Sequence, residues 1–325
     1  MSDGRERALG WLERYALVLV FIAILIFFSL WGETSGTFTT SANIKNVLGN
    51  QAVLGVLSLA IMFPLVCGEF DFSVGPVAGL AQVLCAGFMA RLGMPVGVAV
   101  LLGLAVGALV GIVVGLTVAR IGVNSLIATL GISAVLSGIV IWYTNSQSII
   151  TGISTRLTDL GSGDWFGIPR TVYVLALVAA LVYYLLEHTP FGRYLHSIGS
   201  NPRAARLVGL PVERLVMVSF ILSGTLAALA GVLLVARNGA ASPQVGTVSD
   251  SLQALTAAFL GATAIRPGRF NVVGTLVAVF FLAFCITGLS LAGVASWIND
   301  VFTGTVLFVA VLLSTVLGRR RAVAR

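Results

Sequence analysis

The chain has 325 residues, of which 58% are hydrophobic and 10% are charged, and its formal net charge is +7. With a mean hydropathy of +1.04, this composition excludes an ordinary soluble surface, which needs roughly a quarter or more of charged residues. The positive charge does not indicate nucleic-acid binding, because the arginines are scattered between apolar runs without interleaved aromatic residues. Apolar runs of about 20 residues favour helices over barrel strands, so we predict an all-α polytopic membrane protein.

The first apolar run, at about 15 to 31, follows several arginines and lacks a small-x-small cleavage site. We therefore expect a retained anchor rather than a signal peptide. Further spans are predicted at about 48–66, 74–90, 96–118, 126–143, 172–186, 215–235, 252–265, 272–291 and 301–317. About ten spans would place both termini on one side of the membrane, in a single transmembrane domain over residues 1–325.

Basic residues give these spans an orientation, because cytoplasmic loops carry an excess of lysine and arginine. With the N-terminus inside, 14 of the 19 lysines and arginines fall on the cytoplasmic side. This arrangement places a polar stretch, residues 191–214, and both termini in the cytoplasm. The ends of the second, third and eighth spans are the least clear in the sequence. If one of these spans did not cross the membrane, the orientation of every later segment would be reversed.

Small residues recur at four-residue spacing in two predicted spans, at Gly103, Gly107, Gly111 and Gly115 and at Ser223, Ala227 and Gly231. Stripes of this kind let helix backbones approach closely. The pattern therefore predicts a compact bundle of helices.

The polar stretch 191–214 contains the signals of a short helix. Asn201 can cap free N–H groups and Pro202 suits a first helical position, while Ala204 and Ala205 are strong helix formers. A glycine at 209 then indicates a stop. A helix of about two turns is marginal alone, so we expect neighbouring helices or a partner to hold it. The alternative is a solvated loop.

A family resemblance begins in this stretch, where residues 192–210 read GRYLHSIGSNPRAARLVGL. They resemble the cytoplasmic coupling segment of membrane permeases of ribose-type ATP-binding-cassette sugar importers. Residues 68–75 (GEFDFSVG), 124–131 (NSLIATLG) and 261–274, with an internal RPGR, resemble the same family in the same order. Glu69 is an extra charge beside the family's Gly-x-x-Asp-x-Ser-x-Gly pattern, and Asn124 stands where the family often has proline.

The resemblance implies a permease subunit of the ribose or branched-chain amino acid type, in a prokaryotic cytoplasmic (inner) membrane, that carries a monosaccharide or related polyol. Its implied partners are a second permease chain, two ATPase subunits and a soluble binding protein. ATP and magnesium would act on the ATPases, so this chain would need no cofactor of its own. The residues implied in coupling to a groove of the ATPase are Gly199, Asn201, Pro202, Ala204, Ala205 and Gly209.

Several motifs of enzymes are missing. The only lysine, Lys45, lies between Ile44 and Asn46, outside any Gly-x-x-x-x-Gly-Lys-Ser/Thr phosphate loop. There is also no Gly-x-Ser-x-Gly elbow and no His-Glu-x-x-His zinc motif. The sequence thus predicts a transport subunit without ATPase activity and without a metal site.

Polar residues in and between the spans are candidates for a translocation path or gate: Asn50, Gln51, Asp71, Ser73, Gln82, Thr129 and Ser133. A path for a hydroxyl-rich solute needs such groups, but hydrogen bonds between helices would use them equally. Glu69 and Asp71 could instead serve an ion-coupled secondary transporter. A passive channel or scaffold, or an importer of another small solute such as an amino acid, are further alternatives.

Overall fold

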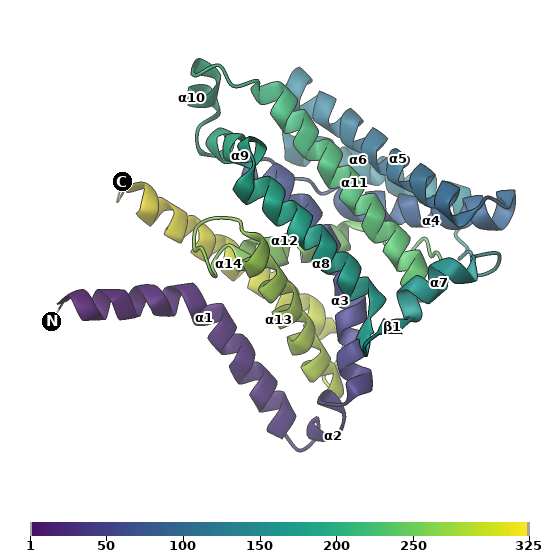
Figure 1. Cartoon of the computed structure of the whole chain (residues 1–325), viewed down its shortest axis with the longest axis horizontal. Coiled ribbons are helices and arrows are strands. Elements are labelled where there is room, and N and C mark those ends of the chain that lie inside the picture. The colour runs from purple at the N-terminus through teal and green to yellow at the C-terminus, as the bar shows by residue number, and fades with distance from the viewer. Residues whose placement is uncertain (1, 324–325) are drawn as a thin grey trace. The chain divides into compact units, whose positions relative to one another are not determined.

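The computed structural model describes the backbone of residues 2–323 and the side chains of residues 14–314. Over this range helices form nearly all of the regular secondary structure (Figure 1). The longer helices are α1 (Ser2–Leu30), α3 (Ser41–Val66), α4 (Val74–Leu92), α5 (Val96–Gly115), α6 (Ser125–Thr144), α8 (Arg170–Tyr183), α11 (Val212–Asn238), α12 (Val248–Gly261), α13 (Val272–Leu291) and α14 (Trp297–Val323). The shorter ones are α2 (Ser35–Phe38), α7 (Thr155–Ser162), α9 (Pro190–Ser200) and α10 (Pro202–Leu207). The all-α prediction is confirmed.

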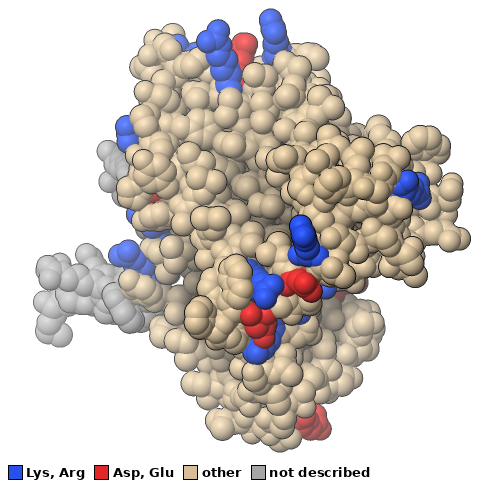
Figure 2. Space-filling view, turned by 45° about the vertical axis from the view of Figure 1, so that its right-hand side comes forward, with Lys and Arg blue, Asp and Glu red and all other residues tan. Residues whose placement is uncertain are grey.

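Eight helices in the described part of the chain are long and apolar enough to cross a membrane. The other two predicted spans coincide with the apolar part of α1, Arg14–Leu30, and with α12. At 14 residues, α12 rises only about 21 Å, which is short of a hydrocarbon core of roughly 30 Å. Figure 2 shows a face on which charged side chains are few and wide areas are uncharged, as a lipid-embedded surface requires.

The chain forms two compact units, one combining the first 51 residues with those from Leu255 onward and the other spanning residues 52–254. In the second unit, α11 packs against α4 and α5. A Cβ at Gly111 would lie 2.5 Å from the carbonyl oxygen of Phe220, and one at Gly107 would overlap Gly224. The predicted glycine stripe on α5 is therefore confirmed as a contact surface at these positions.

In the other unit, α1 packs against α13 through aromatic side chains. The rings of Phe21 and Phe281 meet edge to face with centroids 6.1 Å apart, and Phe28 lies 5.5 Å from Phe38. Gly288 provides the necessary space, because a Cβ there would overlap the ring of Phe28. This apolar packing holds α1 against α2 and α13 within the unit.

A tight turn precedes α13 in this unit, within the family-like stretch 261–274. The Asn271 side chain accepts a hydrogen bond from the Gly274 N–H at 2.7 Å and donates to the carbonyl oxygens of Gly261 and Ala264. It thereby caps α13 and satisfies carbonyls that end α12. One buried asparagine holds the turn closed.

The connection between α6 and α8 is more structured than the sequence indicated. It contains α7 and a two-residue antiparallel hairpin, β1 (Asp164–Trp165) with β2 (Ile168–Pro169). A Cβ at Gly161 of α7 would overlap the backbone of Ala236, so α7 lies directly on the C-terminal end of α11. Figure 1 shows α10 at the opposite end of α11.

Candidate functional site

The polar stretch forms two consecutive helices, α9 and α10. Thr189 caps α9, and the Asn201 side chain accepts a hydrogen bond from the Ala204 N–H at 3.0 Å at the start of α10. Pro202 occupies the first helical position, and Gly209 adopts a φ of 82°, which disfavours other residues. The short helix predicted from these residues is confirmed, and the solvated-loop alternative is wrong.

Two of the predicted coupling residues are used inside the chain. Ala205 is 4% exposed, and its carbonyl oxygen accepts a hydrogen bond from the Leu210 N–H at 3.1 Å. Gly199 lies so close to α3 that a Cβ would overlap the carbonyl oxygen of Val66. The idea that Ala204 and Ala205 together form the docking face is therefore corrected, because only Ala204 of the pair is exposed.

The exposed surface of α10 is apolar at its C-terminal end. Leu207 is 88% exposed and the next residue, Val208, is 77% exposed, with the exposed Arg203 and Arg206 beside them. We call Leu207 and Val208 the apolar tip. The apolar tip is not among the coupling residues predicted from the sequence. Two large apolar residues at the end of a six-residue helix, within a polar stretch, could have indicated a contact surface.

A buried polar network surrounds Asp71, between α3 and α4. Asp71 is 2% exposed; one carboxylate oxygen accepts hydrogen bonds from the N–H and hydroxyl of Ser73, at 3.0 and 2.5 Å. The other oxygen accepts from the Ser223 hydroxyl on α11 at 2.7 Å. Asp71 lies outside the apolar spans; burial raises the pKa of its carboxyl, whereas the hydrogen bonds from Ser73 and Ser223 oppose that increase.

The segment 68–75 is anchored to further helices through its backbone. The Phe72 carbonyl oxygen accepts hydrogen bonds from Ser133 on α6 at 3.1 Å and from Ser251 on α12 at 2.8 Å. The Phe70 N–H donates to the Ser125 hydroxyl at 3.1 Å. Three serine side chains, two on α6 and one on α12, thus satisfy an irregular backbone that would otherwise be costly to bury.

The remaining path candidates divide into two groups. The Gln82 amide donates to the carbonyl oxygens of Ser242 and Val245 at 2.8 and 2.7 Å, and the Thr129 hydroxyl donates to a carbonyl of its own helix. Both side chains are fully buried, as Ser133 is, and their hydrogen bonds are made within the chain; a role of these three residues in the path stays a prediction. Asn50 is exposed and Gln51 is half-buried, and they stay candidates for the path.

The asparagine at position 124, where the resembled family often has proline, also has a structural explanation. The Asn124 side chain accepts hydrogen bonds from the N–H groups of Leu126 and Ile127, at 3.0 and 3.3 Å, and so caps α6. Its φ of −55° is one that proline would also adopt. Proline would fit the backbone at this position, but only asparagine can also supply the two cap hydrogen bonds.

We expect Asp71→Ala to lower the stability of the purified chain by about 1 to 3 kcal/mol for each hydroxyl left without an acceptor. Asp71→Asn, which keeps one acceptor oxygen, should have an intermediate effect. Thermal unfolding in detergent measures this, with Asp159→Ala, an exposed carboxylate, as control. Equal melting temperatures for Asp71→Ala and the control would show that the network does not stabilise the fold.

A bundle of apolar helices, with the polar stretch 191–214 between two of them and a buried polar network around Asp71, is the architecture expected of a membrane permease. The chain belongs to the family described as branched-chain amino acid transport system / permease component, whose model matches residues 43–311. It is a multi-pass membrane protein and a transport subunit, not an enzyme. The expected membership of the ribose-type permeases is confirmed by matches to ribose import permeases over more than 90% of the chain.

Relatives at full length support the same conclusion. The chain is 32% identical to the ribose import permease protein RbsC of Haemophilus influenzae, over 93% of this chain and 94% of that one. It is 35% identical to RbsC of Bacillus subtilis, over 96% and 94%. It is also 26% identical to the xylose transport system permease protein XylH of Escherichia coli, over 95% and 93%. No solved structure matches the chain.

Proposed function

We propose that this chain forms the translocation path for a monosaccharide or related polyol in an ATP-driven importer. The single observation that carries the proposal is its likeness over nearly its whole length to permeases named for ribose and xylose, two pentoses. The absence of charged side chains along most of the spans agrees with a neutral, hydroxyl-rich cargo. Branched-chain amino acids are the second candidate, because the family description names them.

We further propose that α10 couples the chain to a separate ATPase. The chain has no phosphate-binding lysine motif, so ATP and magnesium would bind on that partner. The exposed tip of Leu207 and Val208 suits an apolar groove, and the neighbouring Arg203 and Arg206 suit an acidic rim. The complex would contain two such ATPases, a second permease chain beside this one and a soluble binding protein outside.

An ion-coupled mechanism is less favoured by the geometry. Both carboxylate oxygens of Asp71 already accept hydrogen bonds from serine hydroxyls, which leaves little capacity for a coupling cation. The network therefore supports a structural or gating role for Asp71 within an ATP-driven permease.

The proposal is tested by uptake in cells that carry this chain with its ATPase and binding protein. We expect accumulation of labelled ribose or xylose against a gradient, which persists with ionophores and stops on ATP depletion. Labelled leucine in parallel separates the two cargo classes. Uptake that ionophores abolish while ATP is present would refute an ATP-driven importer.

We predict that both termini lie in the cytoplasm, from the excess of basic residues in the loops assigned to that side. The C-terminal residue, Arg325, is outside the described residues, so a reporter rather than geometry must decide. A fluorescent reporter fused after Arg325 should be active inside the cell, and a periplasmic phosphatase fused there should be inactive. The reverse result would mean that a predicted span, with the short α12 as first candidate, does not cross.

A further inference from the structure

A pocket opens between two membrane helices at the end of the bundle that carries α10. Helices α5 and α11 stay in close contact down to Gly115, where a Cβ would lie 3.0 Å from the Met217 side chain. Beyond this point α5 continues as a π-helical turn, Leu116–Ile121, and the pocket lies between that turn and the start of α11. Its volume is about 340 Å³, and its lining includes Leu116, Ala119, Arg120, Glu213, Arg214 and Met217.

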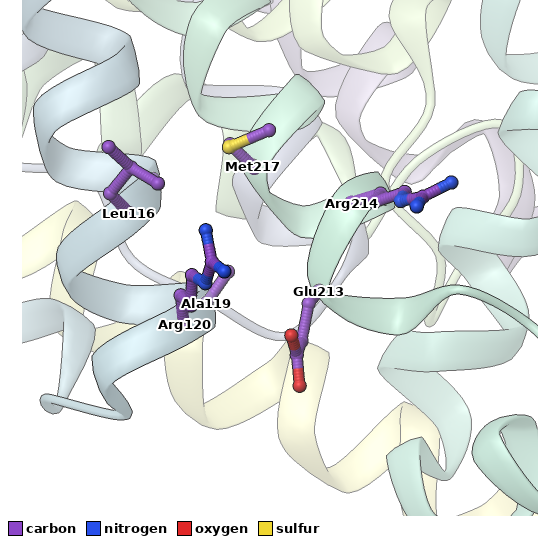
Figure 3. Close-up of a pocket in the computed structure, with 7 residues that line it drawn as sticks. Leu116, Ala119, Arg120, Glu213, Arg214 and Met217 are labelled. Carbon is purple, nitrogen blue, oxygen red and sulfur yellow. The ribbon is translucent and has the colours of Figure 1, made fainter.

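One wall of this pocket is apolar and one guanidinium lies across it. Leu116, Ala119 and Met217 form the apolar wall. In Figure 3, the guanidinium of Arg120 extends toward Met217, whereas the Glu213 carboxylate points away from it. Within the described residues, no carboxylate forms an ion pair with Arg120. The pocket therefore offers a cation beside a hydrocarbon surface, with room for an anionic group.

A second hollow of about 390 Å³ adjoins the first and extends its basic rim. Both are lined by Glu213 and Arg214, and the second is also lined by Arg206 and by the 209–212 connection from α10. Figure 3 shows the Arg214 guanidinium on the other side of α11 from Arg120. Three arginines thus surround the start of α11 with a single acidic residue among them.

The outer wall of the pocket continues into an exposed apolar surface of α5. Leu116 is 36% exposed, and Ile112 and Val113, one turn earlier on α5, are exposed as well. A lipid lying on α5 could therefore reach the pocket without leaving the bilayer surface. The pocket also lies at the end of two spans, which is the depth of phosphate headgroups.

We propose that the pocket binds an anionic phospholipid, with its phosphate on Arg120 and the upper part of an acyl chain along Leu116, Ala119 and Met217. Arginine matches phosphate geometry, and basic pockets between membrane helices suit anionic headgroups. The bound lipid would bridge the end of α5 and the start of α11, directly beside the connection from α10. The coupling segment would then be stabilised by the membrane itself.

The test uses the purified full chain in neutral detergent, titrated with dioctanoyl-phosphatidylglycerol or, as the neutral comparison, dioctanoyl-phosphatidylcholine. Melting temperature and native mass spectrometry report binding. We expect the anionic lipid to bind and stabilise the chain more strongly than the neutral one. Arg120→Gln should weaken binding of the anionic lipid about fivefold, the effect of removing one cation near a phosphate.

The matched control is Arg269→Gln, which removes the same charge from an exposed position outside both pockets and should leave lipid binding unchanged. Ala119→Trp keeps Arg120 but fills the space beside the apolar wall, so it should also weaken lipid binding. This variant replaces Arg120→Gln in the test if Arg120→Gln does not fold. The proposal is overturned if Arg120→Gln retains the full lipid preference, or if inorganic phosphate stabilises the chain equally. If these variants lose association with the ATPase without any change in lipid binding, the pocket binds the protein partner instead, and the lipid proposal is also overturned.

Discussion

Leu207→Glu should abolish uptake and release the ATPase during purification, while the chain itself stays folded and inserted. Leu207 is 88% exposed, so the substitution removes no internal contact. If Leu207 fills an apolar groove of the partner, its burial stabilises the contact by about 1.5 to 3 kcal/mol. Its loss then weakens docking roughly ten- to hundredfold, and a buried, unpaired carboxylate adds to the penalty. Copurification of the ATPase with the tagged chain measures the effect.

The matched control for this prediction is Phe166→Glu, a fully exposed apolar residue in the hairpin at the opposite end of α11. It should retain the ATPase in full. Ala205→Trp is a poor substitute for Leu207→Glu, because Ala205 is buried and a tryptophan there would disturb the fold itself. Normal uptake by Leu207→Glu with a full complement of ATPase would mean that the apolar tip does not dock.

Gly111→Ala should sharply reduce the amount of folded protein. The added Cβ would lie 2.5 Å from the carbonyl oxygen of Phe220 and 2.7 Å from the Cα of Ile221, so α5 and α11 would have to separate. Overpacking of this kind costs about 1 to 3 kcal/mol, and a backbone atom cannot rotate away as a side chain can. The yield of monodisperse protein and its melting temperature are the measurements.

Gly131→Ala on α6 is the matched control, because nothing lies within 4 Å of a Cβ at that position. There the substitution should leave stability unchanged or raise it by up to about 1 kcal/mol, since alanine is the better helix former. The same glycine-to-alanine substitution is therefore predicted to lower stability at position 111 and to leave it unchanged or raise it at position 131. Equal melting temperatures for the two variants would contradict the close approach of α5 and α11.

The sequence alone determined the features that depend on neighbours along the chain. Apolar runs of membrane length located the helices, because a helix satisfies its backbone within a single segment. The cap at Asn201, the proline that follows it and the glycine at position 209 located α10, since capping joins residues only three apart. The four-residue glycine spacing on α5 likewise predicted a close contact, although not which helix would make it.

Only the tertiary structure decided which side chains face inward and which remain available. Ala205 and Leu207 are two residues apart in the same helix, yet the fold buries the first and exposes the second. Asp71 is hydrogen-bonded to Ser223, 152 residues later in the chain, and Gln82 to acceptors 160 and 163 residues later. Hydrogen bonds over such separations depend on how the helices pack, and no local pattern encodes that. Gln82 and Ser133, which suited a path by composition, are hydrogen-bonded inside the fold to the 242–245 connection and to the Phe72 carbonyl oxygen, because a buried donor needs an acceptor within the protein.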